Sequence, residues 1–311
     1  MLLISFVSSS PQNTSRDIFT INGGTMSTIS LKCDEVIDEV ACSVDHSVNY
    51  MYIYIMAALS AGMSLSPIDT TIATEAPPHM LVIGLGGGRF HTHAINHHAA
   101  LHVDSVEISA NMVQVAQSYF GFDACEVISV NSDESLREFL SKSFVSSACR
   151  SRVVVADGFA FLAEAVAQEK TYDFIVVDMF DTRVVEYAGD SGVGDGNIVT
   201  PTLLLNVAQA LHANRGIALI YLIDDAMYDS HVLAIRRLFK RVIHLAISGN
   251  SHILAVSHWE DLGIAPGKRY VDGESNFDVS YLADRVEKYA TSHNYESRLV
   301  HEYKYAFTVL Q

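Results

Sequence analysis

From Met80 to His258, short apolar runs alternate with longer amphipathic segments. The apolar runs are shorter than ordinary helices and are bounded by Gly, Asp or polar residues, so they predict β-strands, and the segments between them predict helices. Apolar strands that alternate with helices form a parallel sheet covered on both faces. The chain is therefore expected to fold as an open α/β domain. The successive parallel strands are expected in MLVIG, VDSVEI, RVVVADG, YDFIVVD and GIALIYLI.

The end of this alternation predicts an antiparallel addition to the sheet. The runs RVIHLAIS and HILAVSH are separated only by a short segment that contains Gly249 and Asn250. Gly and Asn at such a junction favour the tight turn of a β-hairpin. We expect this hairpin to place an antiparallel strand at or near the edge of the sheet.

The rest of the chain divides around this domain. Residues 1–57 form a small N-terminal β segment, with strands expected in LLISFV, RDIFTI and TISLKC, and a linking helix is expected over 44–63. Residues 58–260 form the α/β domain, and the pattern lapses in an insertion at 121–150, which contains one polar-faced helix. Residues 261–311 are expected to be a helical tail, with the helix in DVSYLADRVEKYATS.

The charge of the chain bounds its partners. Lys and Arg total 20 and Asp and Glu total 36, which gives a formal net charge of -16. Such a surface repels nucleic-acid phosphates and attracts cations, so no nucleic-acid partner is expected. Amines, polyamines and basic proteins are compatible partners, although the acidity can also serve solubility alone.

The cysteines and the hydropathy predict a compartment. Cys33, Cys42, Cys125 and Cys149 form no CxxC pair, and their spacing suits neither a zinc site nor a disulfide framework. Free thiols in a reducing compartment are therefore expected. MLLISFV is too short for the apolar core of a signal peptide, and no segment approaches the length of a membrane span. We expect a cytoplasmic or nuclear protein with no membrane partner.

The first strand ends in a glycine cluster, Gly84-Leu85-Gly86-Gly87-Gly88. A phosphate-binding P-loop requires GxxxxGK[ST], and no Lys follows these glycines. The dinucleotide fingerprint GxGxxG also fails, because its third glycine is replaced by Arg89 in one register and by His91 in the other. A sulfonium nucleoside remains compatible, since it carries no phosphate and needs only close approach of the backbone and nearby carboxylates.

Carboxylates end the next three strands. Glu107 follows the second strand, Asp157-Gly158 the third, and Asp178 the fourth, with Asp181 close behind. All these positions lie on the carboxyl edge of the sheet, where open α/β folds bind ligands, and an acid after the second strand can accept both ribose hydroxyls of an adenine nucleoside. Glycine loop, Glu107, Asp157-Gly158 and Asp178 recur in the order found in S-adenosylmethionine-dependent enzymes. Asp157 and Asp178 can alternatively be helix N-caps.

Histidines crowd the helix after the glycine cluster. His93 and His97 lie four residues apart, as do His98 and His102, a spacing that can hold zinc. The two pairs face different directions and no third ligand is evident. We therefore expect no metal and a solvated, histidine-rich helix face.

The segments VIGLGGG, VEIS, NMVQVAQSYFGF, ADGFAFLAEAV and YDFIVVDMFD together resemble the spermidine-synthase-like methyltransferases, over roughly residues 45–258. The resemblance implies a Rossmann-like class I methyltransferase fold with an N-terminal β segment and S-adenosylmethionine as methyl donor. The apolar content of 49% is compatible with a homodimer, although core packing explains it equally well. The resemblance also implies that the glycines approach the methionine part, Glu107 holds the ribose, Asp157 holds the adenine amine, and Asp178 and Asp181 serve the acceptor. The cofactor-binding residues are expected to be Gly84, Gly86, Gly88, Glu107, Ile108, Asp157, Gly158 and Asp178.

The chain also resembles true spermidine synthases but departs from them at two places. Their glycine loop resembles GGGDGG, and the acid in it is missing here. Their fourth-strand motif resembles DSxDP, of which Asp178 and Asp181 are kept while the Ser and the Pro are lost. These departures favour methyl transfer to an amine of a protein over aminopropyl transfer to a polyamine. A scaffold of the same fold that binds the nucleoside or dimerises without catalysis is the third reading.

Overall fold

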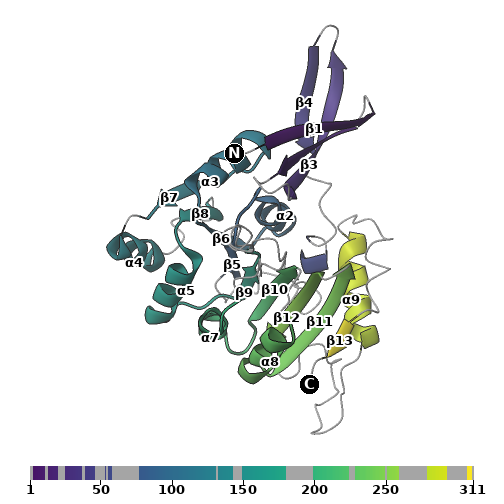
Figure 1. Ribbon diagram of the computed structural model, residues 1–311. Coiled ribbons are helices and arrows are strands. Elements are labelled where there is room, and N and C mark those ends of the chain that lie inside the picture. Colours follow the sequence, from purple (N-terminus) through teal and green to yellow (C-terminus); the bar gives the residue numbers. More distant parts are fainter. Residues whose placement is uncertain are drawn as a thin grey trace, which may run out of the picture.

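The computed structural model describes the chain in separate stretches, and a nine-stranded sheet forms its centre (Figure 1). The strand order is β13-β11-β12-β10-β9-β5-β6-β8-β7. From β5 to β10, all neighbouring strands of the α/β core pair in parallel, and β7 adds a further parallel strand at one edge. The described residues are 3–10, 13–19, 25–36, 39–45, 53, 55–57, 77–130, 132–142, 149–179, 199–223, 228–248, 251–258, 279–292 and 307–309.

The central strands are those expected from the apolar runs. The chain runs from β5 through β6 to β8 on one side of the sheet, and then returns to place β9 and β10 on the other side of β5. This reversal between β5 and β9 is the topological switch point at which such sheets bind ligands. The strands are β5 (His79–Ile83), β6 (His102–Glu107), β8 (Ser151–Val155), β9 (Phe174–Val177) and β10 (Ile217–Ile223).

The expected hairpin is confirmed. β11 (Arg241–Ser248) and β12 (Ser251–Ser257) pair antiparallel, and β12 also pairs antiparallel with β10. The two residues of the expected turn lie outside the described residues. Two further strands were not expected: β7 (Glu126–Ser129), inside the insertion, and β13 (Phe307–Val309), which joins β11 from the C-terminal tail.

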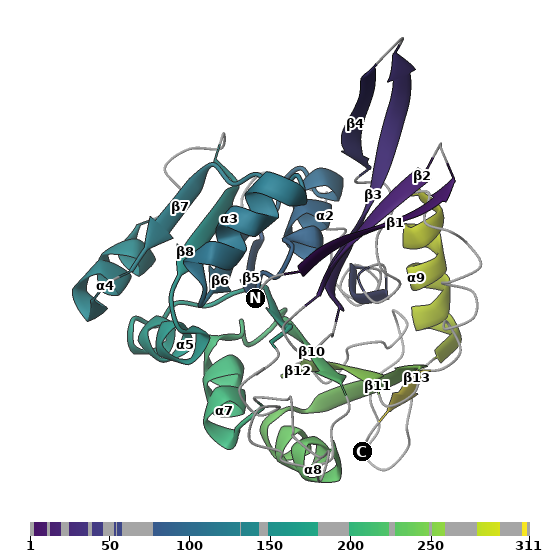
Figure 2. The same cartoon turned by 45° about the horizontal axis from the view of Figure 1, so that its top comes forward.

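Helices cover both faces of this sheet (Figure 2). On one face, Phe90 of α2 and Val286 of α9 pack against strand residues such as Val82. On the other face, helices α4, α5, α7 and α8 pack against strand residues such as Leu81. The helices are α2 (Arg89–His97), α3 (Ala110–Tyr119), α4 (Asp133–Ser141), α5 (Gly158–Ala167), α7 (Pro201–Ala210), α8 (Tyr228–Leu238) and α9 (Val279–Ser292). None of the helices within the described ranges is long and apolar enough to cross a membrane.

The N-terminal segment forms a separate antiparallel sheet of four strands in the order β1-β2-β3-β4. The expected β segment is therefore present, with one strand more than the sequence indicated. Asp45 ends the fourth strand, so the linking helix does not begin there, and the described helical residues start at Ile53. The strands are β1 (Leu3–Ser10), β2 (Asn13–Phe19), β3 (Thr25–Val36) and β4 (Glu39–Asp45).

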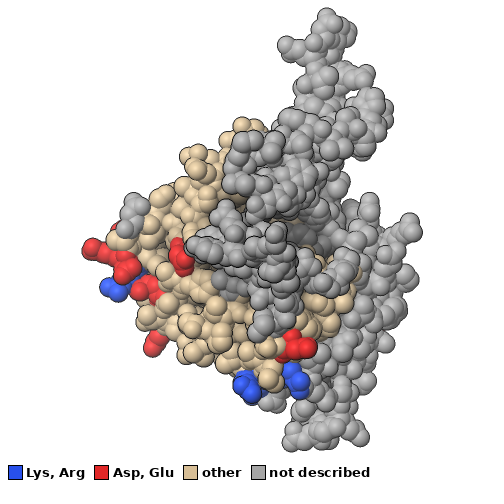
Figure 3. Space-filling view, viewed as in Figure 1, with Lys and Arg blue, Asp and Glu red and all other residues tan. Residues whose placement is uncertain are grey.

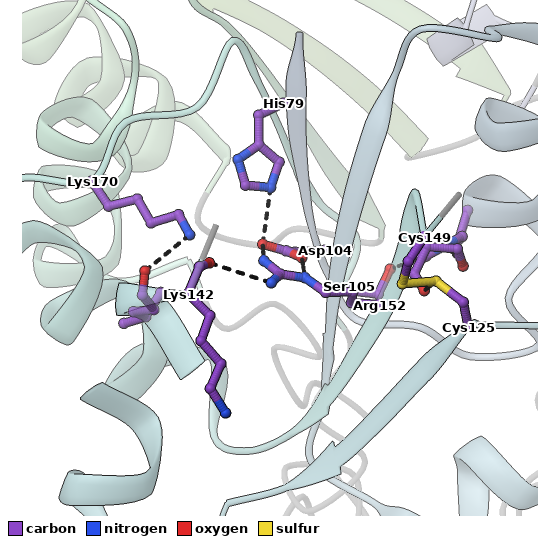
Figure 4. Close-up of polar contacts among 11 residues, drawn as sticks. His79, Asp104, Ser105, Cys125, Lys142, Cys149, Arg152 and Lys170 are labelled. Atoms are coloured by element: carbon purple, nitrogen blue, oxygen red, sulfur yellow. Dashed lines mark hydrogen bonds and ion pairs between the residues drawn. A yellow bond between two sulfur atoms is a disulfide. The ribbon is translucent and has the colours of Figure 1, made fainter. Parts of the chain in front are cut away.

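A buried ion pair joins two central strands (Figure 4). Arg152 on β8 donates from Nε to Asp104 Oδ1 at 2.8 Å and from its terminal nitrogen to Oδ2 at 2.9 Å. His79 on β5 lies 2.9 Å from the same Oδ2. Burial raises the pKa of Asp104, but the hydrogen bonds and charges of His79 and Arg152 outweigh burial and hold that pKa well below its usual value.

The same guanidinium connects the sheet to the insertion. It lies 4.4 Å from the ring centroid of Phe139 on α4, and it donates to the carbonyl of Lys142 just after that helix. Arg152 therefore holds α4 against the sheet as well as pairing with Asp104.

The expectation of free thiols is wrong for one cysteine pair. Cys125 and Cys149 form a disulfide, 24 residues apart in the sequence, and no free cysteine occurs among the described residues (Figure 4). The pair is brought together because β7 and β8, which follow the two cysteines, lie side by side in the sheet. Spacing along the chain cannot reveal this proximity, since it arises from a strand pairing that the sequence did not predict.

Charged side chains on the described surface gather at its margins in the view of Figure 3. One acidic group lies over α4 and α5, where Glu134, Glu138 and Glu164 line a shallow groove. Arg137 and Lys142 form ion pairs with two of these glutamates and offset part of the charge.

Candidate functional site

Backbone hydrogen bonds join the ends of the four central strands. Gly84 N donates to Val106 O at 2.9 Å, Asp178 N to Ile83 O at 2.9 Å, and Ala156 N to Glu107 O at 3.0 Å. The glycine loop, Glu107, Asp157 and Asp178 therefore lie together at the carboxyl edge, around the topological switch point. Asp181 lies outside the described residues.

Glu107 is the centre of this arrangement. Its Oε2 accepts hydrogen bonds from Leu85 N at 3.1 Å and from Gly86 N at 3.3 Å, and its Oε1 accepts one from Ser109 N at 3.0 Å. A carboxylate oxygen can accept two hydrogen bonds, so lone pairs remain on Oε1 for a ligand. The side chain is half-buried. Glu107 thus fixes the shape of the glycine loop and remains able to accept hydroxyl groups.

Two glycines are required by the backbone. Gly84 has φ of 94°, and a side chain there would overlap the carbonyl oxygen of Asp178. Gly88 has φ of 70° at the start of α2, and a side chain there would overlap the ring of Phe122. Only glycine adopts such conformations without strain, so both residues allow close packing around the loop.

Gly86 has a different role from its neighbours. Its φ is 52°, and a side-chain carbon built there would meet no atom of the described chain within 4 Å. The space above Gly86 therefore allows a ligand to approach the backbone directly.

The residues after β6 and β8 complete the edge. Ile108 is 64% exposed although it is a large apolar residue, so it offers an apolar contact beside Glu107.

Asp157 caps helix α5, because its Oδ1 accepts hydrogen bonds from Phe159 N at 2.8 Å and Ala160 N at 3.0 Å. Both hydrogen bonds use Oδ1, and Oδ2 makes none within the described residues, so capping and ligand binding are compatible. Gly158 fits closely against Ile83.

The expected solvated histidine face is wrong. His91, His93 and His98 are each no more than 2% exposed, and Arg89 at the start of the same helix is 5% exposed. The rings of His93 and His97 are tilted at 39° to each other with centroids 4.3 Å apart, while the ring of His98 stacks on Tyr289 of α9. Within the described residues, no group of three potential ligands surrounds a metal position.

His91 links α2 to two strands. Ser151 Oγ donates its single proton to the carbonyl of Asp123, so His91 Nε2 carries a proton and donates to Ser151 Oγ at 2.7 Å. Nδ1 then accepts from Ser105 Oγ at 2.6 Å. Burial lowers the pKa of His91 to about 3, although the Asp104 carboxylate opposes this shift. The imidazole is therefore neutral and structural.

This histidine predicts a pH dependence of stability. Its pKa is lower in the folded chain than in the unfolded chain, so the unfolded chain binds the extra proton between about pH 6.5 and pH 3. The contribution of His91 to the free energy of unfolding is fully present above that window. It is lost as the pH falls through the window, by about 1 kcal/mol per pH unit. Urea unfolding at pH 7, 6 and 5 measures the slope, and His91→Gln is expected to make it shallower. An equal slope in the variant would show that the pKa of His91 does not differ between the folded and the unfolded chain.

The sequence did not single out three residues that support the site. Phe122 packs beneath Gly88, Ser109 donates to Glu107 and caps α3, and Ser151 anchors His91. The serine after a strand and before a helix is an N-cap signal that could have identified Ser109. The other two contacts depend on strands that meet only in the folded chain.

Comparison with known proteins finds similarity over part of the chain. Residues 69–188 match the spermine/spermidine synthase domain. The chain is 28% identical over 123 residues to the eEF1A lysine and N-terminal methyltransferase of Mus musculus. This aligned region covers 39% of this chain and 14% of that protein. The chain is also 24% identical over 183 residues to the polyamine aminopropyltransferase of Vibrio vulnificus, covering 58% of this chain and 50% of that protein. The chain thus spans half or less of the length of these relatives.

A solved structure supports the fold. Human methyltransferase-like protein 13 in complex with SAH aligns with a TM-score of 0.55 and 19% identity, over 79% of this chain and 93% of that chain. The expected α/β fold, with a mostly parallel sheet and an antiparallel edge, is confirmed, as is the resemblance to the spermidine-synthase-like family.

Proposed function

We propose that this chain, which carries a spermidine-synthase-like domain, transfers a methyl group from S-adenosylmethionine to an amine of a protein. The observation that carries the proposal is the Glu107 carboxylate, held by three backbone N–H groups beside the glycine loop. Its remaining acceptor capacity faces the edge of the sheet at which nucleosides bind.

The other edge residues fit the parts of the donor. Ile108 offers its exposed side chain to the adenine ring, and Asp157 offers Oδ2 to the adenine amine. The open space at Gly86 suits the methionine part, whose carboxylate prefers backbone N–H groups near the start of α2. Asp178, half-buried beside Gly84, lies where the acceptor would approach the sulfonium.

The reaction asks the protein mainly to position its substrates. The bond between the sulfonium sulfur and the methyl carbon breaks as the amine nitrogen attacks that carbon in line, and S-adenosylhomocysteine leaves. The amine must first be neutral, so its proton passes to a nearby base or to water. We assign this role to the Asp178 carboxylate, which would orient the nitrogen lone pair and stabilise the cation formed, with Asp181 as a second carboxylate.

The acceptor is proposed to be cationic before reaction. The relatives are named for transfer to a protein lysine or N-terminus and for aminopropyl transfer to polyamines, and both kinds of acceptor are amines. The net charge of -16 attracts a basic protein more than a nucleic acid. The domain boundaries, a cytoplasmic location and a homodimer stay predictions.

Aminopropyl transfer to a polyamine is the second candidate, favoured by the domain match itself. Its donor has lost the carboxylate and presents only an ammonium at that end. A site for this donor requires a nearby anion, whereas the loop here carries none. The absence of a loop acid therefore favours S-adenosylmethionine.

Donor preference tests the two candidates. S-adenosylmethionine is expected to bind about tenfold or more tightly than its decarboxylated form, because one charge-assisted contact differs by about 1.5 kcal/mol or more. Gly86→Asp places an acid in the open space and is expected to narrow or reverse the preference. The positive φ strains any side chain there, but Asp and Asn adopt it more readily than most residues. Gly86→Asn is the uncharged control, and calorimetry measures each affinity.

Three outcomes separate the readings. Tighter binding of the decarboxylated donor, with conversion of putrescine to spermidine, would replace methyl transfer with the synthase reading. Binding of S-adenosylmethionine without turnover on any basic protein or polyamine would favour the scaffold. Methylation of a basic protein by the wild-type chain, lost in Asp178→Asn, supports the proposal.

A further inference from the structure

Helix α2 is held from below by two chain segments, and each segment carries one cysteine of the disulfide. Cys125 ends the segment that follows α3, and Cys149 begins the segment that leads into β8. The two segments are also joined by the hydrogen bond from Cys125 N to Ser151 O at 3.0 Å. The covalent bond between the two segments is visible in Figure 4. Together the two segments form a base beneath α2.

The first segment supports the start of α2. Phe122 fills the space beneath Gly88, the N-cap of the helix, and its ring meets His91 edge-on at 5.1 Å between centroids. The carbonyl of Asp123 accepts the proton of Ser151 Oγ, which ties this segment to the second.

The second segment contacts α2 at both ends. Ser151 anchors His91 in the first turn, with 2.7 Å between Oγ and Nε2. Arg150 donates to the carbonyl of His98 at 2.8 Å, and more distantly to the carbonyls of Leu101 and Ile95 around the end of the helix. The residues next to Cys149 thus cap the helix at one end and fix it to the sheet at the other.

The glycine loop depends on this base, because Gly88 is both the last glycine of the loop and the N-cap of α2. A displacement of α2 would move Gly88 and, two residues earlier, the Gly86 N–H that donates to Glu107. The disulfide lies outside the donor site but controls the position of its loop.

The bond is also accessible to a reactant. Cys125 is exposed and Cys149 is half-buried, in contrast to the buried side chains between them and the loop. Exposed disulfides are the ones that exchange readily with thiols, whereas buried ones resist reduction.

We propose that Cys125–Cys149 is a thiol-exchange site through which a small thiol of the glutathione class controls donor binding, a role that rests on the function proposed above. The thiolate attacks Cys125 Sγ, the disulfide bond breaks, and Cys149 leaves as a thiolate that takes a proton from water. A second thiol then attacks the mixed disulfide, which yields the Cys125 thiol and the oxidised form of the reductant. Two electrons pass from two thiols to the bridge.

Reduction opens the loop that contains β7 and α4, and it leaves the two segments beneath α2 joined by hydrogen bonds alone. The reduced chain is expected to remain folded, because the Arg152–Asp104 pair and the β7–β8 pairing do not involve the two cysteines. Its glycine loop is less well fixed, and the donor binds more weakly.

The experiment uses the full chain in the oxidised form, after reduction with glutathione, and after reoxidation. Calorimetry with S-adenosylhomocysteine is expected to show that reduction raises Kd by about fivefold or more, reversibly. Hydrogen exchange read out by mass spectrometry is expected to show faster exchange in residues 89–98 without any ligand, and peptide mapping is expected to find the glutathione adduct on Cys125.

Matched variants assign the effect to this bridge. Cys33→Ser with Cys42→Ser removes the other two cysteines and is expected to keep the full response to glutathione. Cys125→Ser with Cys149→Ser is expected to bind as weakly as the reduced chain and to be insensitive to glutathione. If that variant does not fold, the oxidised, reduced and reoxidised wild-type chains still compare donor binding with and without the bridge.

The outcomes separate this proposal from the proposed function. An oxidised chain that binds no S-adenosylhomocysteine contradicts the proposed function. Hydrogen exchange in residues 89–98, compared between the oxidised and the reduced chain, then decides whether the bridge holds α2. An oxidised chain that binds with the same Kd after complete reduction overturns control of the donor site. If glutathione neither forms an adduct on Cys125 nor reduces the bond, thiol exchange itself is overturned.

Discussion

Glu107→Ala is expected to weaken binding of S-adenosylmethionine by at least about tenfold while the chain stays folded. The substitution removes the proposed acceptors for the ribose hydroxyls, and each charge-assisted bond contributes about 1.5–3 kcal/mol. It also leaves the N–H groups of Leu85, Gly86 and Ser109 without their carboxylate partner, which loosens the glycine loop. Calorimetry with the donor and circular dichroism of the unliganded chain measure the two effects.

Two controls make this result specific. Glu107→Gln keeps one carbonyl oxygen for the loop but loses the charge, so its affinity is expected between that of the wild type and Glu107→Ala. Glu134→Ala removes an acid from the distant groove over α4 and is expected to leave affinity unchanged. A folded Glu107→Ala chain with wild-type affinity would remove Glu107 from the site.

Asp104→Ala is expected to cost about 3–5 kcal/mol of the free energy of unfolding, because it leaves the buried Arg152 guanidinium without a carboxylate. His79 loses the same partner. Urea unfolding followed by circular dichroism measures the loss. Asp104→Asn, which keeps an acceptor of the same shape, is expected to lose less, and it serves as the readout if the alanine variant does not fold.

An exposed ion pair gives the matched contrast. Arg137 on α4 pairs with Glu164 on α5, but its side chain is 64% exposed, so solvent already stabilises the charge. Arg137→Ala is expected to change stability far less than Asp104→Ala. Similar losses in the two variants would show that burial does not decide the strength of the Asp104–Arg152 pair.

The sequence predicted the parts of the fold that depend on local pattern. Continuous apolar runs gave the central strands, and the polar residues at their ends gave the positions of Glu107, Asp157 and Asp178 at one edge. These predictions succeed because a parallel strand covered on both faces has no polar side, so its bounds are visible in composition.

The predictions that failed concern residues whose environment is made by distant segments. β7 alternates between half-buried and exposed positions at the sheet edge, so it lacks the apolar run of a central strand. The Cys125–Cys149 bond follows from the pairing of that strand with β8. His91 is a polar residue that the sequence placed on a solvated face. It is buried because Ser105 and Ser151, on two strands, form hydrogen bonds with both ring nitrogens.

The contact of Gly84 with Asp178 couples the loop after β5 to the backbone after β9. The two backbones meet at a position that leaves no room for a side chain. A changed backbone after β9 would therefore disturb the glycine loop. Under the proposed function, the affinity for the donor and the choice of acceptor would then change together, so a redesign for a new amine should leave this junction intact and vary the surface segments around it.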